Sequence, residues 1–488
     1  MAMPVNRILA ATAFGLLSAC SLAPDYRVPD TAVPAAYKES GVWRQATPAA
    51  ALPRDAWWRL YRDNVLNDLE IEIEQGNPTL AQAVARYDAA RGYLEEIQSA
   101  EYPTLTAGGH ATTNRQSDNR PLRSASQPTN YGDDLAGGIL FWDLDFWGKI
   151  RNRTVVGKAE AQASFADLQD IRLSLQAQLA DSYVELRGLD AQSALLQNAI
   201  GIYAKAFQIT TDRHAKGIAS GLDIGRAQTQ LETAKAQYSD VAARRSLLEH
   251  AIASLVGTPA SSFTIPEAAA ALTLPVVPTG VPSALLQRRP DIAAAERRVA
   301  ATNAEIGVAR AAFYPDISLS GLAGFQNTGN DALFTAPDAY WALGPSLAFT
   351  LFDAGRHEGQ LAVAKAGNSA AAAAYRSAVL HAFQDVEDNL ALLGRLADEA
   401  SSESKSVAAA TRTQKLALSL YQNGALGFLD VVVAQTAALQ AQQAALSIET
   451  RRLQASVNLI HALGGGWSAD DSSLANAETS PGRNTHHM

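Results

Sequence analysis

Hydrophobic residues alternate with small or polar residues in two segments of the second half of the chain. From Ile317 to Phe325 every second residue is apolar or small, and a similar alternation runs from Trp341 to Leu351. Successive side chains of a strand point to opposite faces of a sheet, so a period of two is typical of strands. Weaker alternation occurs twice in the first half. The pattern predicts four strands, at about 104–114, 131–142, 316–326 and 341–351.

The predicted strands have the length that crosses a bilayer at a tilt, which is about 9 to 11 residues. Aromatic residues near their ends fit an interfacial girdle, although tryptophan at strand ends also occurs in soluble sheets; they are Trp142, Trp147, Trp341 and Phe349. A closed barrel needs at least about eight strands, and an open sheet edge cannot face lipid. Four strands per chain therefore predict that several copies share one barrel.

Two long segments lack proline, one between Pro128 and Pro259 and the other between Pro345 and Pro481. Within 222–256, Leu231 begins a heptad pattern of apolar and small residues, which is typical of a closely packed coiled coil. We therefore expect two long helical hairpins, one over 151–256 and one over 356–463.

The chain contains an internal repeat. The segment His214–Gln230 recurs without a gap as Tyr421–Ala437, 207 positions later. Such a period is far longer than that of solenoid repeats and indicates a duplicated, domain-sized unit. We predict repeat 1 over 57–258, a linker over 259–281 and repeat 2 over 282–467. The helical turns are expected at four glycines, of which the first of each pair should adopt a positive φ; they are Gly217, Gly221, Gly424 and Gly427.

The N-terminal segment has the pattern of an export signal. Arg7 precedes an apolar run that ends at Leu17, and Ser18-Ala19-Cys20 follows. This run is too short to span a bilayer, and its small-residue end fits cleavage. Residues 1–19 are predicted to be a signal peptide that ends in a motif resembling the bacterial lipobox. Cys20 would then carry a covalent lipid such as palmitate; the alternative is a free cysteine in an ordinary export signal.

Two further segments are expected to lie outside the repeats. Residues 20–56 contain several prolines and are predicted to form an extended leader. Residues 468–488 are predicted to be a polar, disordered tail. Beyond the export signal no window of about 18 apolar residues occurs, so we expect no transmembrane helix, and any spanning part should be a β-barrel.

Composition and motifs argue against nucleic-acid binding and catalysis. The formal net charge is −9, whereas nucleic-acid-binding domains usually carry a basic patch. The eight histidines offer no pair at metal-ligand spacing on one helix face, and no phosphate loop or nucleophile elbow occurs. Asp353-Ala354-Gly355 is better explained as a helix start than as a protease loop. We expect no enzymatic activity, no bound metal and no cofactor.

Several motifs together resemble those of a known family. They are Cys20, Pro24-Asp25-Tyr26, Trp57-Trp58, Arg288-Arg289-Pro290-Asp291-Ile292, Phe313-Tyr314-Pro315, Leu351 to Arg356, and Tyr421 to Asp430. In this order they look like an outer-membrane factor, similar to the TolC and OprM-like channels and to their lipoprotein branch, often called NodT. The resemblance covers nearly the whole mature chain. It implies a membrane α/β fold: a homotrimer in which four strands per chain close a 12-stranded transmembrane barrel, continued by a coiled-coil helical tunnel.

The resemblance also implies a function. Such proteins are passive exit ducts of tripartite efflux systems in the outer membrane of Gram-negative bacteria. They dock with a periplasmic adaptor and an inner-membrane pump, commonly a proton-driven exporter of the RND type, and they contribute to multidrug resistance. A type I protein-secretion exit has the same architecture and stays an alternative. A non-conducting coiled-coil lipoprotein is another, but it would not need strands with apolar faces. The sequence does not name the exported compound.

By the same resemblance, the two turns form the periplasmic tip that closes the channel. Asp430 matches an aspartate of the constriction, and Tyr421 matches a tyrosine that ties the closed tip. The chain departs from the family pattern at Val433 and Leu420, where an acidic and a basic residue are often found. The matching positions in repeat 1 bring Asp223 and Arg226 to the tip. We hypothesise that Arg226 and Asp430 form an ion pair that holds the tip shut, with a hydrogen bond from Tyr421. The alternative is that both aspartates only cap helices.

Overall fold

The computed structural model describes residues 21–39, 56–121, 124, 126–268, 272–277, 286, 288–329 and 332–467. The predicted signal peptide, Cys20 and the predicted tail from 468 onward lie outside the described residues. None of the helices in the described part is long and apolar enough to cross a membrane.

The chain forms two compact units, and each combines pieces of both repeats. The first, which we call the strand unit, comprises the described residues up to Asp30 together with Arg86–Ser164 and Ala294–Tyr375. The second, the hairpin unit, comprises Thr31–Ala85, Phe165–Ala293 and the described residues from Arg376 onward.

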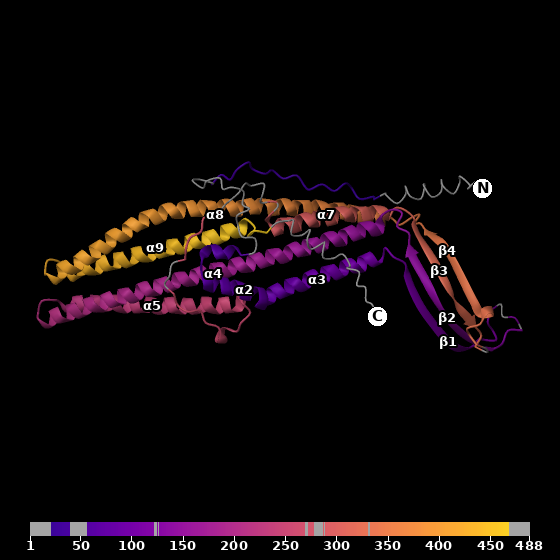
Figure 1. Cartoon of the computed structure of the whole chain (residues 1–488), viewed down its shortest axis with the longest axis horizontal. Coiled ribbons are helices and arrows are strands. Elements are labelled where there is room, and N and C mark those ends of the chain that lie inside the picture. Colours follow the sequence, from indigo (N-terminus) through magenta and orange to yellow (C-terminus); the bar gives the residue numbers. More distant parts are fainter. Residues whose placement is uncertain are drawn as a thin grey trace, which may run out of the picture. The chain divides into compact units, whose positions relative to one another are not determined.

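Four strands of the strand unit form one antiparallel sheet in the order β1-β2-β3-β4 (Figure 1). They are β1 (Thr104–Arg115), β2 (Asn130–Asp143), β3 (Asp316–Asn327) and β4 (Ala339–Ala348), the last preceded by the short helix η3 (Ala336–Asp338). Each repeat contributes one hairpin, and β2 pairs with β3 to join them. The expectation that β4 covers 341–351 is wrong at its end, because Ala348 pairs with Asp316, the first residue of β3, and no partner strand continues beyond it.

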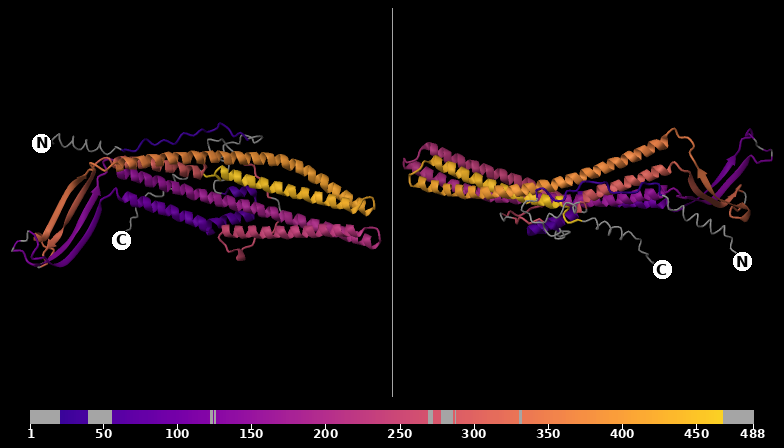
Figure 2. Two further views of the ribbon diagram at one scale, coloured as in Figure 1. Left: turned by 180° about the vertical axis from the view of Figure 1, so that it is seen from behind. Right: turned by 90° about the horizontal axis from the view of Figure 1, so that it is seen from above.

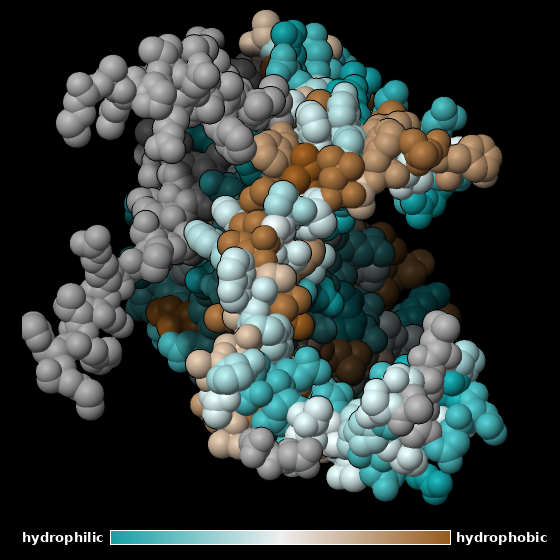
Figure 3. All heavy atoms as spheres, turned by 90° about the vertical axis from the view of Figure 1, so that its right-hand side faces the viewer, coloured by the Kyte–Doolittle hydropathy of each residue, from teal (hydrophilic) through white to brown (hydrophobic). Residues whose placement is uncertain are grey.

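The strand register places the apolar residues of neighbouring strands on one face. Leu105 faces Leu140, which faces Gly321, which in turn faces Leu343. In the next row of the same face, Ala323 lies opposite Trp341. Leu105, Trp341 and Leu343 are 74%, 78% and 64% exposed in the single chain. Figure 3, viewed from the side on which Figure 1 draws the strands, shows hydrophobic side chains at the surface beside hydrophilic ones.

The sheet is open at both edges in the described chain. β1 pairs only with β2, and β4 pairs only with β3. Each edge strand has at least ten residues, and its outer N–H and C=O groups lack a ladder partner there. Unpaired edges of this length are unstable in lipid and promote pairing with another chain in water.

The leader is extended and lies against helix α7 (Pro290–Ala311) of the strand unit. The carbonyl of Leu22 accepts a hydrogen bond from Arg310 (3.0 Å), and the carbonyl of Pro24 accepts one from Asn303 (2.8 Å). Gly307 lets the leader approach closely, since a Cβ there would lie 2.8 Å from Ala23 Cβ. The chain that follows position 20 is thus held to the folded protein by side chains.

The long helices of the two repeats have equal lengths. Helices α4 (Lys149–Ala215) and α8 (Arg356–Gln422) have 67 residues each, and α5 (Gly221–Leu255) and α9 (Phe428–Ala462) have 35 each. Each of these two long helices of repeat 2 starts 207 residues after its counterpart, at 356 against 149 and at 428 against 221. In both views of Figure 2, as in Figure 1, α5 runs back along α4 and α9 along α8.

Shorter elements complete the hairpin unit and the strand unit. The hairpin unit contains η1 (Trp57–Tyr61), α2 (Asn64–Gly76) and η2 (Ala260–Ser262). Helix α3 (Pro78–Ser99) continues from the hairpin unit into the strand unit. Its counterpart in repeat 2 is α7, which also has 22 residues.

Small apolar clusters and one buried ionic group hold the first hairpin together. Leu196 and Val241 belong to one cluster between α4 and α5. Arg245, on the predicted coiled-coil seam, is 8% exposed, and its Nε lies 2.6 Å from Asp190 Oδ1. Asp190 also accepts a hydrogen bond from Arg187 at 2.9 Å. A buried cation in a seam is tolerated when it is paired in this way.

Candidate functional site at the hairpin turns

Both hairpin turns end a long helix with a glycine in the left-handed region. Gly217 has φ +73° and Gly424 has φ +78°. In the first turn, Ile218 N donates to the carbonyl of Arg213 at 2.8 Å, and in the second turn Ala425 N donates to that of Leu420 at 2.9 Å. This pattern satisfies carbonyls that a helix end leaves free, and only glycine adopts its φ without strain. The predicted positive φ at both positions is confirmed.

The helices that follow the two turns are capped differently. Ser220 precedes α5, and its Oγ accepts a hydrogen bond from Asp223 N at 3.2 Å, while Asp223 Oδ2 accepts one from Ser220 N at 3.3 Å. This reciprocal pair is a capping box. Gly427 occupies the equivalent position before α9 and offers no side chain. Asp430 is exposed and has no hydrogen bond or ion pair with the described residues.

Arg226 and Asp430, the hypothesised gate pair, are not joined within the single chain. Arg226 Nη1 lies 3.6 Å from Asp223 Oδ1, one turn away on the same helix. That pair is partly exposed, so its net contribution is about 0.5 kcal/mol or less. Asp223 therefore acts mainly as a cap, as the alternative interpretation proposed, whereas Asp430 is free to bind a partner outside its own chain.

Tyr421 is buried between the two hairpins and is 4% exposed. Its hydroxyl donates to Thr210 Oγ1 on α4 at 3.3 Å. Its ring packs edge-on against Phe428, with 5.2 Å between the ring centroids. The guanidinium of Arg213 lies 4.9 Å from the same ring, and its Nη1 donates to the carbonyl of Gln422 at 3.1 Å. Tyr421 thus ties the second turn to the first hairpin of the same chain.

Sequence reasoning missed Thr210, Arg213 and Phe428. The sequence did contain an indication for two of these residues, because the two repeats carry different residue types at the equivalent positions, which lie 207 residues apart. Thr210 corresponds to Ala417 and Arg213 to Leu420. The basic residue that repeat 2 lacks at Leu420 is supplied by Arg213 of the other hairpin. Comparing the repeats residue by residue would have indicated which polar side chains of α4 have a special role.

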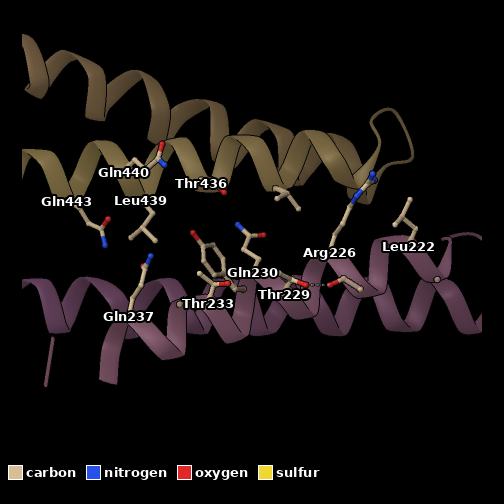
Figure 4. Close-up of a pocket in the computed structure, with 15 residues that line it drawn as sticks. Leu222, Arg226, Thr229, Gln230, Thr233, Gln237, Thr436, Leu439, Gln440 and Gln443 are labelled. Atoms are coloured by element: carbon tan, nitrogen blue, oxygen red, sulfur yellow. Dashed lines mark hydrogen bonds between the residues drawn. The ribbon is translucent and has the colours of Figure 1, made fainter. Parts of the chain in front are cut away.

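A groove of about 630 Å³ lies between α5 and α9 behind the turns (Figure 4). Its lining combines apolar and polar side chains and has one charged residue, Arg226 near the turn, with Gln237 and Gln443 further along. Other lining residues are threonines and glutamines, including Thr229, Thr233, Thr436 and Gln440. The lining has no arrangement of nucleophile, base and oxyanion donor, and the described residues contain no group of three His, Cys, Asp or Glu that could hold a metal ion. Its threonine and glutamine side chains can offer hydrogen bonds.

Two buried side chains lie at this groove: Tyr203 lines it, and Gln435 precedes the lining residue Thr436. Tyr203 donates from its hydroxyl to the backbone carbonyl of Gln435 at 3.3 Å. Burial raises the pKa of Tyr203, so the hydroxyl stays protonated and can act as this donor. The side-chain amide of Gln435 is fully buried, and neither of its polar atoms has a partner among the described residues.

The two repeats each match one family. The model of the outer membrane efflux protein family matches residues 71–258 and again 281–465. The chain belongs to this family. Its predicted place in the outer membrane of Gram-negative bacteria and its role as the exit duct of an efflux system are thereby confirmed.

Known efflux proteins are similar to this chain over nearly its whole length. The toluene efflux pump outer membrane protein TtgF of Pseudomonas putida is 31% identical over 463 residues, covering 92% of this chain and 95% of that protein. The cation efflux system protein CusC of Escherichia coli is 29% identical over 458 residues, covering 92% and 96%. The solved outer-membrane channel OprN superposes with a TM-score of 0.85 at 30% identity, covering 92% of this chain and 100% of that chain. The predicted fold class, with four strands and two long helical hairpins per chain, is that of these channels.

Proposed function

We propose that three copies of this chain assemble into one duct, in which each copy adds its four strands to a 12-stranded barrel and its two hairpins to a helical tunnel. The observation that carries this proposal is the open sheet. Its two edges are unpaired, and one face carries exposed Leu105, Trp341 and Leu343. Joining β1 of one copy to β4 of the next removes every edge and turns the apolar face toward lipid.

The same proposal includes two partners and a lipid anchor. The duct receives its cargo from an inner-membrane pump of the RND type through a periplasmic adaptor that contacts the hairpin turns. Cys20 carries the lipid, and two hydrogen bonds hold the residues that follow it, 22–24, to α7. The cargo is a small molecule whose identity is set by the pump, since relatives of similar identity are named for toluene and for cations.

We further propose that Asp430 closes the tip by pairing with Arg226 of a neighbouring copy. Two observations support this arrangement. Asp430 has no partner among the described residues of its own chain, and Arg226 is held only by a 3.6 Å contact to Asp223.

A transport assay tests the duct. A strain that lacks its outer-membrane duct should regain resistance to pump substrates when it expresses this chain with its pump and adaptor. A variant with Leu343→Asp on the apolar face should reach the membrane fraction poorly and fail to restore resistance, whereas Leu247→Asp, on the exposed side of α5, should behave as the parent. Outer-membrane fractions should contain a heat-modifiable trimer, and purified protein should conduct ions in a planar bilayer.

The results also separate the alternatives. Restored secretion of a large polypeptide without drug resistance would favour a type I secretion exit. A protein that sediments with the outer membrane but neither conducts nor forms trimers would support a structural lipoprotein. The names of the relatives favour efflux of small molecules over both.

A further inference from the structure

A second cavity of the hairpin unit lies between α2, the first part of α4 within this unit and the chain end after α9. Its volume is about 760 Å³. The lining includes Trp57, Trp58, Glu70, Glu74, Arg172 and Trp467. The lining positions on α4, from Phe165 to Gln176, precede Gly217 by 52 to 41 residues, so the cavity is separate from the groove at the tip.

Glu70 is an acidic side chain without a counter-charge. It is 0% exposed, and neither carboxyl oxygen has a partner among the described residues. One turn further along α2, Glu74 is satisfied: its Oε1 accepts a hydrogen bond from Gln176 at 3.0 Å, and its Oε2 lies 3.1 Å from Arg172 Nε. That distance fits an ion pair, although the Nε–H does not point along it as a hydrogen bond requires. Arg172 therefore pairs with Glu74, and Glu70 is left without an ion-pair partner among the described residues.

The surroundings of Glu70 increase the cost of leaving it ionised. Burial, and secondarily the charge of Glu74, raises the pKa of Glu70 well above its ordinary value. Proteins compensate such carboxylates with a cation, or keep them protonated. The described lining contains two cations, Arg172, which pairs with Glu74, and Arg59, whose side chain is exposed. Neither of them forms a hydrogen bond with the Glu70 carboxyl group, so the cavity leaves space for a compensating cation beside it.

Three tryptophans line this cavity. Trp57 and Trp58 are buried and pack edge to face, with their ring centroids 6.0 Å apart and their ring planes at 78°. The third tryptophan, Trp467, lies in the segment that follows α9. Indole faces attract cations, and quaternary ammonium groups are typically bound by such aromatic surroundings. The Nε1 donors of Trp57 and Trp467 are buried without a partner among the described residues. They would suit an oxygen acceptor on the same ligand. A metal ion fits less well, because the described residues offer no group of three metal-binding side chains.

We propose that this cavity binds a small organic ammonium ion that also carries a hydroxyl or carbonyl oxygen. Glu70 is its counter-ion, the tryptophans surround its alkyl groups, and the two indole N–H groups bind its oxygen. The site is distinct from the groove at the turns, and its occupation needs neither pump nor adaptor.

Choline is a suitable probe for the purified full-length protein in detergent, with tryptophan fluorescence and calorimetry as readouts. We expect saturable binding of choline and none of 3,3-dimethylbutan-1-ol, which has the same shape and no charge. Glu70→Gln should weaken choline binding roughly tenfold or more, because it removes the counter-charge and keeps the shape. Glu72→Gln, at an exposed position of the same helix, should leave binding unchanged.

Three results would overturn the proposal: no saturable binding of choline at roughly 10 mM, equal binding of the neutral alcohol, or unchanged affinity in Glu70→Gln. Helix content and the trimer band show whether each variant is folded. If Glu70→Gln does not fold, Trp467→Leu provides the second test, and unchanged choline affinity in that variant would equally exclude the site.

Discussion

The Tyr421 hydroxyl on α8 lies 3.3 Å from Thr210 Oγ1 on α4, and this hydrogen bond joins the two hairpins of one chain beside their turns. The hydroxyl of Thr210 itself donates to the carbonyl of Ala206 at 2.9 Å. The two hydroxyls thus form a short chain that ends on the backbone of α4. The position equivalent to Tyr421 in the first turn is His214, whose Nδ1 instead lies 2.8 Å from the carbonyl of Ala219 in its own turn. The link between the hairpins is therefore one-sided.

Removing this hydrogen bond should loosen the second turn. Tyr421→Phe keeps the ring contact with Phe428 and leaves Thr210 with its backbone acceptor, so we expect a loss of about 0.5–1.5 kcal/mol. Thr210→Val should cost a similar amount, and the double variant should cost less than the sum. Thermal dissociation of the trimer measures all three. Tyr238→Phe, whose hydroxyl accepts a hydrogen bond from exposed Gln197, serves as the control and should change little. Additive losses would mean that the two hydroxyls do not interact.

Mutation of the two tip aspartates should affect different properties, stability for Asp223 and channel conductance for Asp430. Asp223→Ala removes a capping box and should lower stability by about 1 kcal/mol, with little effect on closure. Asp430→Ala should leave stability nearly unchanged and raise single-channel conductance, as should Arg226→Ala, because each removes one side of the proposed gate pair. Unchanged conductance in both Asp430→Ala and Arg226→Ala would refute the pair.

Introducing the serine cap of α5 at the equivalent position before α9 should engage Asp430 in a capping hydrogen bond and withdraw it from the proposed gate pair. Gly427 has φ −75°, which any residue can adopt, and a Cβ there would come within 4 Å only of Asp430 Oδ2, at 3.7 Å. Gly427→Ser should therefore stabilise the hairpin by about 0.5–1 kcal/mol and draw Asp430 into a capping box, which opens the channel.

The neighbouring glycine of the same turn provides the contrast. Gly424→Ser places a side chain at φ +78° and should lower stability by about 1 kcal/mol or more. Melting curves and conductance of the two variants distinguish a cap from a general change in the turn. A loss of stability in Gly427→Ser would show that the cap cannot form there.

Asp170 on α4 should make the hairpin unit more stable in mild acid. The pKa of Asp170 is raised to about 6, mainly by burial and then by the charge of Asp291, while Arg289 opposes the shift and Asp167 adds a smaller increase. The unfolded chain has an aspartate pKa near 3.9, so the folded state binds this proton more tightly. Its contribution grows as pH falls from about 6 toward 4, and the cost of the ionised group is fully present above pH 6.

Asp170→Asn should accordingly raise stability at pH 8 by on the order of 1–2 kcal/mol and have little effect at pH 4.5. Melting temperatures at the two pH values measure this difference. Asp240→Asn, at an exposed position of α5, is the matched control. An equal gain at both pH values would indicate that packing, rather than ionisation, is responsible.

Much of the fold follows from local sequence patterns. The predicted hairpin over 151–256 corresponds to α4 and α5, because proline-free segments and a glycine turn define such helices locally. The end of β4 was missed because alternation continues from Ala348 to Leu351, whereas a strand ends where its ladder partner ends. A period of two indicates side-chain direction, but pairing is a tertiary property.

The site was less predictable, since its contacts join distant helices. The burial of Tyr421 against Thr210 depends on how the two hairpins pack, which no local period encodes. The difference between Ser220 and Gly427 was readable from the repeat, yet its effect on Asp430 needed the geometry of the caps. Glu70 looks like one of several acidic residues on an amphipathic helix, and only the fold shows that it is fully buried.

The equal helix lengths of the two repeats restrict how the protein can evolve. From β1 to α4 the first repeat uses 45 positions (104 to 149), and from β3 to α8 the second uses 40 (316 to 356). This difference of five residues falls in the strands and their connections, whereas α4 and α8, and likewise α5 and α9, have kept identical lengths. Lengthening one helix alone would misalign it with its antiparallel neighbour, so a longer or shorter hairpin pair requires four matched insertions or deletions. The helices therefore keep a fixed length, and the difference between the two repeats lies in the strands and their connections.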